Sequence, residues 1–154
     1  MKDVCVISQL DFHGRLLCEV LGIGPEDFYS FKQVPPDNTY RLMILLGVYL
    51  TTPWEDAIAR VKGSKWLCYW VGTDILFATQ DPHRVARVQT DHTVHWTQRP
   101  TNKAELAEVG IDAKIVPLPV QTNRFRPVPL PDVHVVGNYQ PKPGISPINF
   151  HPEL

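Results

Sequence analysis

Asp74 is the residue whose type and position most directly suggest chemistry. It ends the step Gly72-Thr73-Asp74, which interrupts the apolar run "KWLCYWV" (65–71) before "ILF" (75–77) resumes. A carboxylate at the end of a buried strand can bind a hydroxyl group or act as a general base. The alternative is structural, because Asp is a preferred N-cap residue and a helix beginning at Ile75 would use one. Gly72 would permit a tight turn or a close backbone approach.

His13 is the second candidate for a catalytic role. It lies in "QLDFHG" (9–14), which follows the first apolar run of the chain. Histidine is the commonest general acid or base in enzymes, so we predict that His13 acts together with Asp74, with a plain surface histidine as the alternative. His92 and His95 would point to opposite faces of a strand, and no metal site is predicted.

Known nucleotide and nucleophile motifs are missing. The segment "SQLDFHGRLL" (8–17) has one glycine where a dinucleotide-binding loop would have three. The chain also has no Walker A loop and no Gly-x-Ser-x-Gly elbow. These absences argue against a nicotinamide enzyme, an ATPase and a serine hydrolase.

The candidate residues follow apolar runs that predict buried strands. Three runs, at 4–8, 41–49 and 65–71, are continuous rather than alternating, which is typical of a parallel sheet covered on both faces. Weaker strand patterns are found at 27–34, 92–96, 113–120 and 133–139.

Helical patterns alternate with these strands. They cover 13–22, which ends on Gly22, and 52–63, which opens with Thr-Pro and ends on Lys-Gly, as well as 74–89 and 101–110. Pro82 interrupts the third of these helices. The alternation predicts an α/β fold, a Rossmann-like parallel sheet sandwiched by helices.

In such a sheet, ligands bind at the carboxyl ends of the strands, where the strand order reverses. The run at 65–71 is the fourth expected strand. With the common order 3-2-1-4-5-6, strands 1 and 4 flank the reversal. We therefore expect segments 9–14 and 72–74 to be neighbours in space.

Composition limits the partners. The chain has 154 residues, the size of one domain, and a formal charge of −1 from 15 basic and 16 acidic residues. This balance gives no reason to expect binding to nucleic acid or to an anionic membrane. Cys5, Cys18 and Cys68 sit among apolar neighbours and are expected to be buried free thiols. With no signal peptide pattern and no apolar stretch near the ~20 residues that span a bilayer, we expect a cytoplasmic protein without a membrane span.

The composition changes in the last third, where ten of the 15 prolines lie at or beyond Pro100. We predict that 124–131 forms an extended strap in which Phe125, Val128 and Leu130 are partly buried. The expected domain spans 1–138. The remainder, 139–154, is either a disordered tail or the start of a linker to a C-terminal domain.

Two motifs carry a resemblance to a known family. In "LAEVGIDAKIVPLPVQTNRFRPVPLPD" (106–132), a Gly-Ile helix ending precedes a Val-x-Pro-x-Pro-Val step and a Phe-x-Pro segment. In "YWVGTDIL" (69–76), a Gly-Thr-Asp step follows a strand. Both resemble the N-terminal domain of GT-B glycosyltransferases of the family 4 type, and together with the α/β pattern the likeness covers most of the chain. The segment 9–14 differs from the glycine-rich loop that family members usually have there.

The resemblance implies a function. Such enzymes move a sugar from a nucleotide-sugar donor to an acceptor hydroxyl, usually without a metal, and the N-terminal domain holds a sugar, glycan or lipid acceptor. Asp74 and His13 would be the catalytic positions, and the acceptor would contact Gly14, Gly72, Thr73, Trp54, Trp96 and Thr97. Trp54, Trp70 and Trp96 could supply the aromatic surface on which a sugar stacks, and the alternative for each is ordinary core or rim packing.

The resemblance also implies what this chain lacks. No cofactor is expected, and the donor would bind mainly to a C-terminal donor-binding domain, supplied in cis or in trans. The chain alone is then expected to be inactive. The alternative function is a stand-alone flavodoxin-like α/β module that binds or interacts without catalysis.

Overall fold

Six strands form one sheet in the computed structural model of the chain, which describes residues 2–31, 33, 40–49, 54, 58 and 65–119. Every neighbouring pair of strands is parallel. This confirms the predicted α/β, Rossmann-like fold. In chain order, the strands are β1 Lys2–Ser8, β2 Phe28–Ser30, β3 Tyr40–Leu46, β4 Lys65–Trp70, β5 Thr93–Thr97 and β6 Ala113–Ile115.

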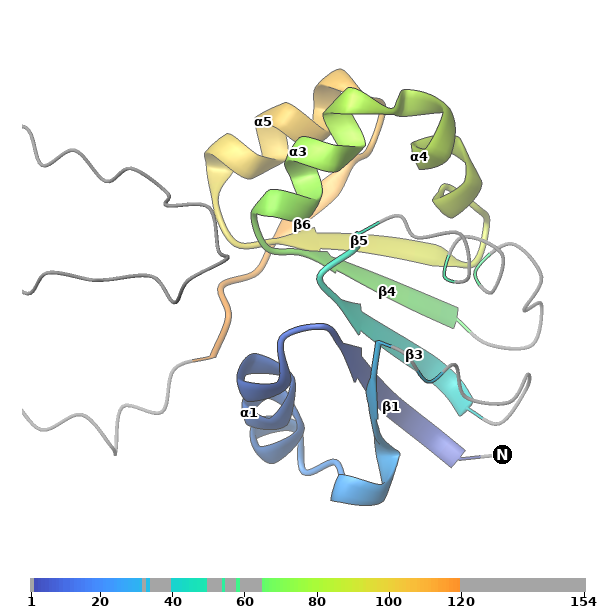
Figure 1. Cartoon of the computed structure of the whole chain (residues 1–154), viewed down its shortest axis with the longest axis vertical. Coiled ribbons are helices and arrows are strands. Elements are labelled where there is room, and N and C mark those ends of the chain that lie inside the picture. The colour runs from blue at the N-terminus through green and yellow to red at the C-terminus, as the bar shows by residue number, and fades with distance from the viewer. Residues whose placement is uncertain are drawn as a thin grey trace, which may run out of the picture. The chain divides into compact units, whose positions relative to one another are not determined.

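Helices lie on both faces of the sheet, and in the described part of the chain one face carries more of them than the other. Figure 1 shows α1 on one face and α3, α4 and α5 on the other. Trp54 and Ile58, the described residues of the predicted helix 52–63, are helical and belong to the same core cluster as α3 to α5. The helices are α1 Asp11–Leu21, α3 Thr73–Gln80, α4 Pro82–Val88 and α5 Pro100–Glu108, with a short 3₁₀ turn, η1, at Pro25–Asp27.

Helix ends follow local sequence signals. Gly22 closes α1 in the left-handed conformation, with φ 67°, as predicted. The predicted helix 74–89 is two helices, because Pro82 has no N–H to continue the first and instead occupies the first position of α4. The segment 9–14, expected to be a loop, already contains the first turn of α1, which begins at Asp11.

The strand order is β2-β1-β3-β4-β5-β6. The expected order 3-2-1-4-5-6 is therefore wrong, because β4 does not pair with β1; β3 lies between them. The chain goes from β1 outward to the short edge strand β2 and then returns past β1 to β3. The first five strands thus have the flavodoxin-like order, whose reversal lies between β1 and β3.

Successive side chains along the inner strands point to opposite faces of the sheet and pack into two separate core clusters. Cys5, Met43 and Trp66 belong to the larger cluster under α3, α4 and α5. Val6, Ile44 and Leu67 point the other way, into a smaller cluster under α1. Because both faces are covered there, the strands read as continuous apolar runs. All three cysteines are free and buried, as predicted.

Several expectations fall outside the described residues: the strand at 133–139, the strap at 124–131 with Phe125, Val128 and Leu130, and the tail 139–154. The sheet belongs to a compact unit that spans Met1–Gln121. In the described part of the chain, no helix combines the length and the apolar character needed to cross a bilayer.

Candidate functional site

The candidate site is the carboxyl edge of the sheet beside the reversal in strand order. It is built from the end of β1 with the first turn of α1, the segment Gly47–Tyr49 after β3, and the turn between β4 and α3. In open parallel sheets, this edge is where ligands bind. The segments after β1 and β4, expected to be neighbours, have the segment after β3 between them.

Asp74 lies in the turn after β4 and joins two segments of this edge. Its side chain has no exposed surface. Oδ2 accepts the backbone N–H of Val48 at 2.8 Å, and Oδ1 accepts those of Gly72 at 2.7 Å and Ile75 at 3.1 Å. The N–H of Val71 lies 3.1 Å from both oxygens. The carboxylate therefore ties the segment after β3 to the turn after β4.

This geometry favours the structural interpretation of Asp74. Burial raises the pKa of its carboxyl group, and the four backbone N–H groups oppose that shift. Both oxygens are used by backbone donors, so a substrate hydroxyl could reach them only if those bonds opened. Asp74 is also not the N-cap: α3 begins at Thr73, and Asp74 is its second residue.

Gly72 and Thr73 complete the turn. Gly72 has φ 157° and ψ −97°, a conformation that residues with a Cβ rarely adopt, although a Cβ there would meet no other atom within 4 Å. Both residues are exposed. The glycine is thus required by the backbone, and the exposed Thr73 is placed where a ligand at this edge would meet it.

His13 and Gly14 lie in the first turns of α1 and differ in their surroundings. His13 is exposed and packs edge-on against Phe12, with ring centroids 5.4 Å apart. Gly14 is buried, and a Cβ there would lie 2.6 Å from both Ser8 Cβ and Phe28 Cε2. Gly14 therefore lets α1 approach β1 and β2, whereas the catalytic role of His13 stays a prediction.

The tryptophans divide between core and surface. Trp54 is buried edge-on against Trp66, and Trp70 is fully buried, donating its Nε1–H to Nδ1 of His95 at 3.2 Å. These two side chains fit the core-packing alternative. Trp96 is half-buried and packs edge-on against Tyr69. Thr97 is buried, and its hydroxyl donates to the carbonyl of Trp70 at 3.2 Å.

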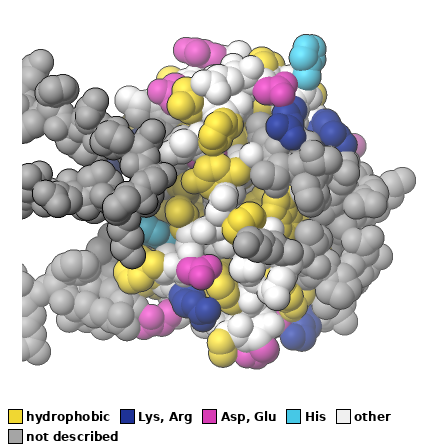
Figure 2. Space-filling view, viewed as in Figure 1, with side chains coloured by type: hydrophobic (Ala, Val, Ile, Leu, Met, Phe, Trp, Pro, Cys, Tyr) yellow, Lys and Arg dark blue, Asp and Glu magenta, His cyan; other side chains and the backbone are white. Residues whose placement is uncertain are grey.

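Sequence reasoning missed two aromatic residues at this edge, Tyr49 and Phe77. Phe77 is 46% exposed on α3, and its ring centroid lies 6.2 Å from that of half-buried Tyr49. Figure 2 shows hydrophobic side chains gathered on the surface over α3 and the sheet beside it. In the sequence, Phe77 follows Ile75 and Leu76 and looks like part of the core, so no local pattern marked it as exposed.

An apolar cavity of about 260 Å³ lies beside α1, on the face of the sheet that α1 covers. It is distinct from the edge occupied by Asp74, although Trp96 contributes to its wall. Its lining residues are Val4, Leu17, Leu21, Ile23, Leu42, Ile44, Leu67, Tyr69 and Trp96. Within the described residues, no group of three or more His, Cys, Asp or Glu side chains could hold a metal ion.

Comparison with known proteins gives no match: no protein-family model, no curated protein and no solved structure is significantly similar to the chain.

Proposed function

We propose that this chain is the acceptor-side Rossmann-like domain of a GT-B glycosyltransferase. One observation carries the proposal: the described parts of the two motifs that resemble this family lie at the same edge of the sheet. Gly72-Thr73-Asp74 follows the end of β4 after one intervening residue, and residues 116–119 follow β6 directly. Only β5 lies between β4 and β6 in the sheet. Far apart in the sequence, the motifs flank one ligand-binding edge.

Hydrogen bonds join these motifs into one unit. The N–H of Val116 donates to the carbonyl of Thr97 at 2.7 Å, and its carbonyl accepts the hydroxyl of Tyr69. Thr97 in turn bonds to the carbonyl of Trp70 on β4. A rigid wall at the carboxyl edge is what an acceptor-binding domain requires, because transfer depends on holding both reactants in one geometry.

In this proposal, the chain binds the acceptor, and a second domain, in cis or in trans, binds the nucleotide sugar. Exposed His13 is the candidate general base for the acceptor hydroxyl, and Thr73 is a candidate acceptor contact. Asp74 contributes by holding the edge in shape rather than by taking the proton.

The strand order supports a second candidate, a flavodoxin-like binding module without catalysis. Its reversal between β1 and β3 is the point at which flavodoxin-like proteins bind ligands. Both candidates use the same edge, so they differ in what they bind there and not in where.

Nuclear magnetic resonance of the ¹⁵N-labelled chain separates the two candidates. We expect methyl glycosides of glucose, galactose and mannose to shift the amide signals of Thr73, His13 and Tyr49, with glycerol as the polyol control. Shifts by one glycoside and not by glycerol would support the acceptor domain. A chain that responds to no glycoside would contradict it and leave the binding module as the better candidate.

A further inference from the structure

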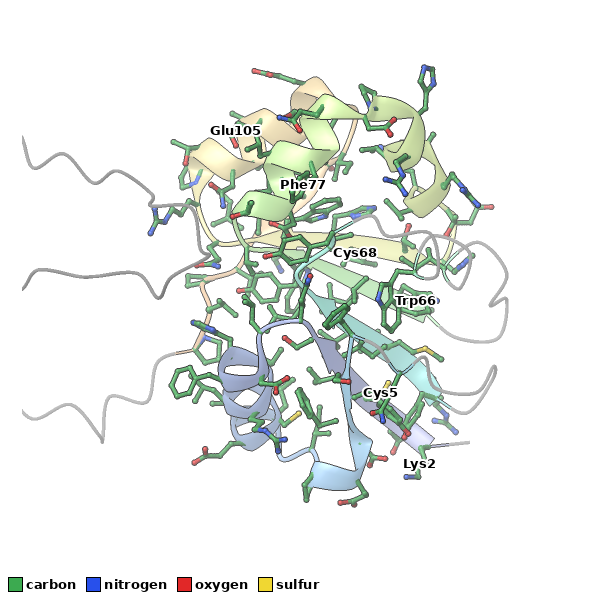
Figure 3. The ribbon with its side chains drawn as sticks, viewed as in Figure 1. Lys2, Cys5, Trp66, Cys68, Phe77 and Glu105 are labelled. Carbon is green, nitrogen blue, oxygen red and sulfur yellow. The ribbon has the colours of Figure 1, made fainter. Side chains whose placement is uncertain are left out.

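Tyr49 and Phe77 form an aromatic pair that belongs to neither core cluster of the described residues. Their rings are inclined at 58°, and they come from different elements, the segment after β3 and helix α3. Phe77 projects from α3 in Figure 3 and remains nearly half exposed, although phenylalanine is usually buried. Exposed aromatic surface at a ligand-binding edge commonly serves recognition.

Two residues, Asp74 and Gly47, hold the segment that carries Tyr49 beside α3. The Asp74 carboxylate fixes Val48, the residue before Tyr49, and lies one helical turn before Phe77 on the same face of α3. Gly47 has φ 83°, and its N–H donates to the carbonyl of Tyr69 at 3.0 Å. A Cβ on Gly47 would lie 2.9 Å from Cε2 of Tyr49, so the ring rests where only a glycine leaves room.

We propose that Tyr49 and Phe77 are the stacking platform for the apolar face of a pyranose ring in the acceptor. This inference rests on the proposed function and names the ligand class and the residues that recognise it. One face of a pyranose presents C–H groups, and burying them against aromatic rings removes apolar surface from water. Because hydrogen bonds hold the backbone of both segments, little backbone entropy is lost when the sugar binds.

The Tyr49 hydroxyl adds a polar contact beside the platform. Burial, and to a lesser extent the negative charge of Asp74, raises the pKa of Tyr49. The hydroxyl therefore stays protonated at neutral pH and can donate a hydrogen bond to a sugar oxygen. The platform thus offers both an apolar face and a donor, which suits a carbohydrate better than a purely apolar ligand.

The chain provides a matched control for the test. Leu76 precedes Phe77 on α3 and is 53% exposed, similar in exposure but without an aromatic ring. We compare Phe77→Leu, Phe77→Trp and Leu76→Ala in titrations with methyl β-D-glucopyranoside, methyl α-D-mannopyranoside and methyl β-D-galactopyranoside, followed by amide chemical shifts. Phe77→Leu keeps an apolar side chain on α3, so it should fold like the parent.

We expect Phe77→Leu to weaken binding of the preferred glycoside by about 3- to 10-fold, because it removes the aromatic face. Phe77→Trp should bind at least as tightly as the parent, and Leu76→Ala should bind equally. Equal binding by all three variants would overturn the platform while leaving the acceptor domain in place. A parent chain that binds no glycoside would instead contradict the proposed function, and the platform with it.

Discussion

At the scale of single residues, Asp74 shows how a side chain suggestive of catalysis can serve the architecture. Its two oxygens accept four backbone N–H groups, from Val48, Val71, Gly72 and Ile75. These donors favour the anion and offset part of the rise in pKa that burial causes. The arrangement needs two acceptors, and only a carboxylate supplies them without a donor.

We therefore predict that Asp74→Asn is destabilising despite its similar shape. In either amide orientation, the NH₂ group faces backbone donors, so at least one buried N–H loses its acceptor. The free energy of unfolding should fall by about 2–4 kcal/mol, measured by urea denaturation. Asp81→Asn is the control: that carboxylate is half exposed, 3.9 Å from Arg84, and should cost under about 0.5 kcal/mol. Equal stability of the two variants would contradict the role given to Asp74.

His95 is a second buried polar residue, and it makes stability depend on pH. Its side chain is 9% exposed, and burial lowers its pKa to about 4. Its Nδ1 accepts the indole N–H of Trp70, so the neutral ring is the form that fits. In the unfolded chain, the imidazole titrates near its ordinary value of 6.5.

The depressed pKa predicts a loss of stability in acid. Above pH 6.5 the ring is neutral in both states, and between pH 6.5 and 4 the unfolded chain binds the proton more readily. As the pH falls through this window, unfolding should become easier by about 3 kcal/mol. In His95→Asn, whose amide oxygen can replace Nδ1, this part of the pH dependence should vanish. The control His83→Asn, at an exposed position, should keep this loss of stability in acid. If the free energy of unfolding of the parent and of His95→Asn fell equally with pH, the prediction would be refuted.

At the scale of elements, the packing of α1 depends on a glycine. Gly14 is buried between α1 and the strands β1 and β2, with Ser8 and Phe28 directly opposite. Alanine favours a helix over glycine by about 1 kcal/mol, so propensity alone would make Gly14→Ala stabilising. The close contact reverses that expectation, because Ser8 Cβ is attached directly to the backbone of β1 and cannot move aside.

We predict that Gly14→Ala lowers the free energy of unfolding by a net amount of about 1–3 kcal/mol. Val20→Ala, at an exposed position of the same helix, should change it by under about 0.5 kcal/mol. Adding Phe28→Leu to Gly14→Ala should recover part of the loss if steric contact is the cause. Thermal melting followed by circular dichroism provides the measurement, and a stabilised Gly14→Ala would show that α1 can shift.

At the scale of the whole sheet, the carboxyl edge suits an uncharged ligand better than a nucleotide diphosphate. The first turn of α1 at the strand-order reversal carries Asp11, which opposes an anion at that helix end. No glycine-rich phosphate loop follows β1. Such an edge supplies few groups to offset charge on a leaving diphosphate.

We accordingly predict that the 154-residue chain alone binds nucleotide sugars weakly and does not transfer sugar. Calorimetric titration with uridine, guanosine and adenosine diphosphate sugars should give dissociation constants weaker than about 1 mM. An assay for released nucleotide in the presence of methyl glycosides should show no turnover. Tight binding of one donor, or repeated turnover, would mean that the donor site lies in this chain.

The sequence alone determined the fold class, because its signals are local. Continuous apolar runs at β1, β3 and β4 can be satisfied only by burial on both faces, and Gly22 and Pro82 end or divide helices through their own backbone chemistry. The carboxyl edge as the place for a site follows from the same pattern, since it depends on parallel strands and not on their order.

Only the tertiary structure decided the strand order and the surroundings of each candidate site residue. The three-residue strand β2 is held beside β1 by long-range pairing, which places the reversal between β1 and β3 rather than between β1 and β4. Asp74 accepts the backbone N–H of Val48, a residue 26 positions away in the sequence. The exposure of Phe77 depends on how α3 packs on the sheet. Such features arise from contacts between distant segments, which no local pattern encodes.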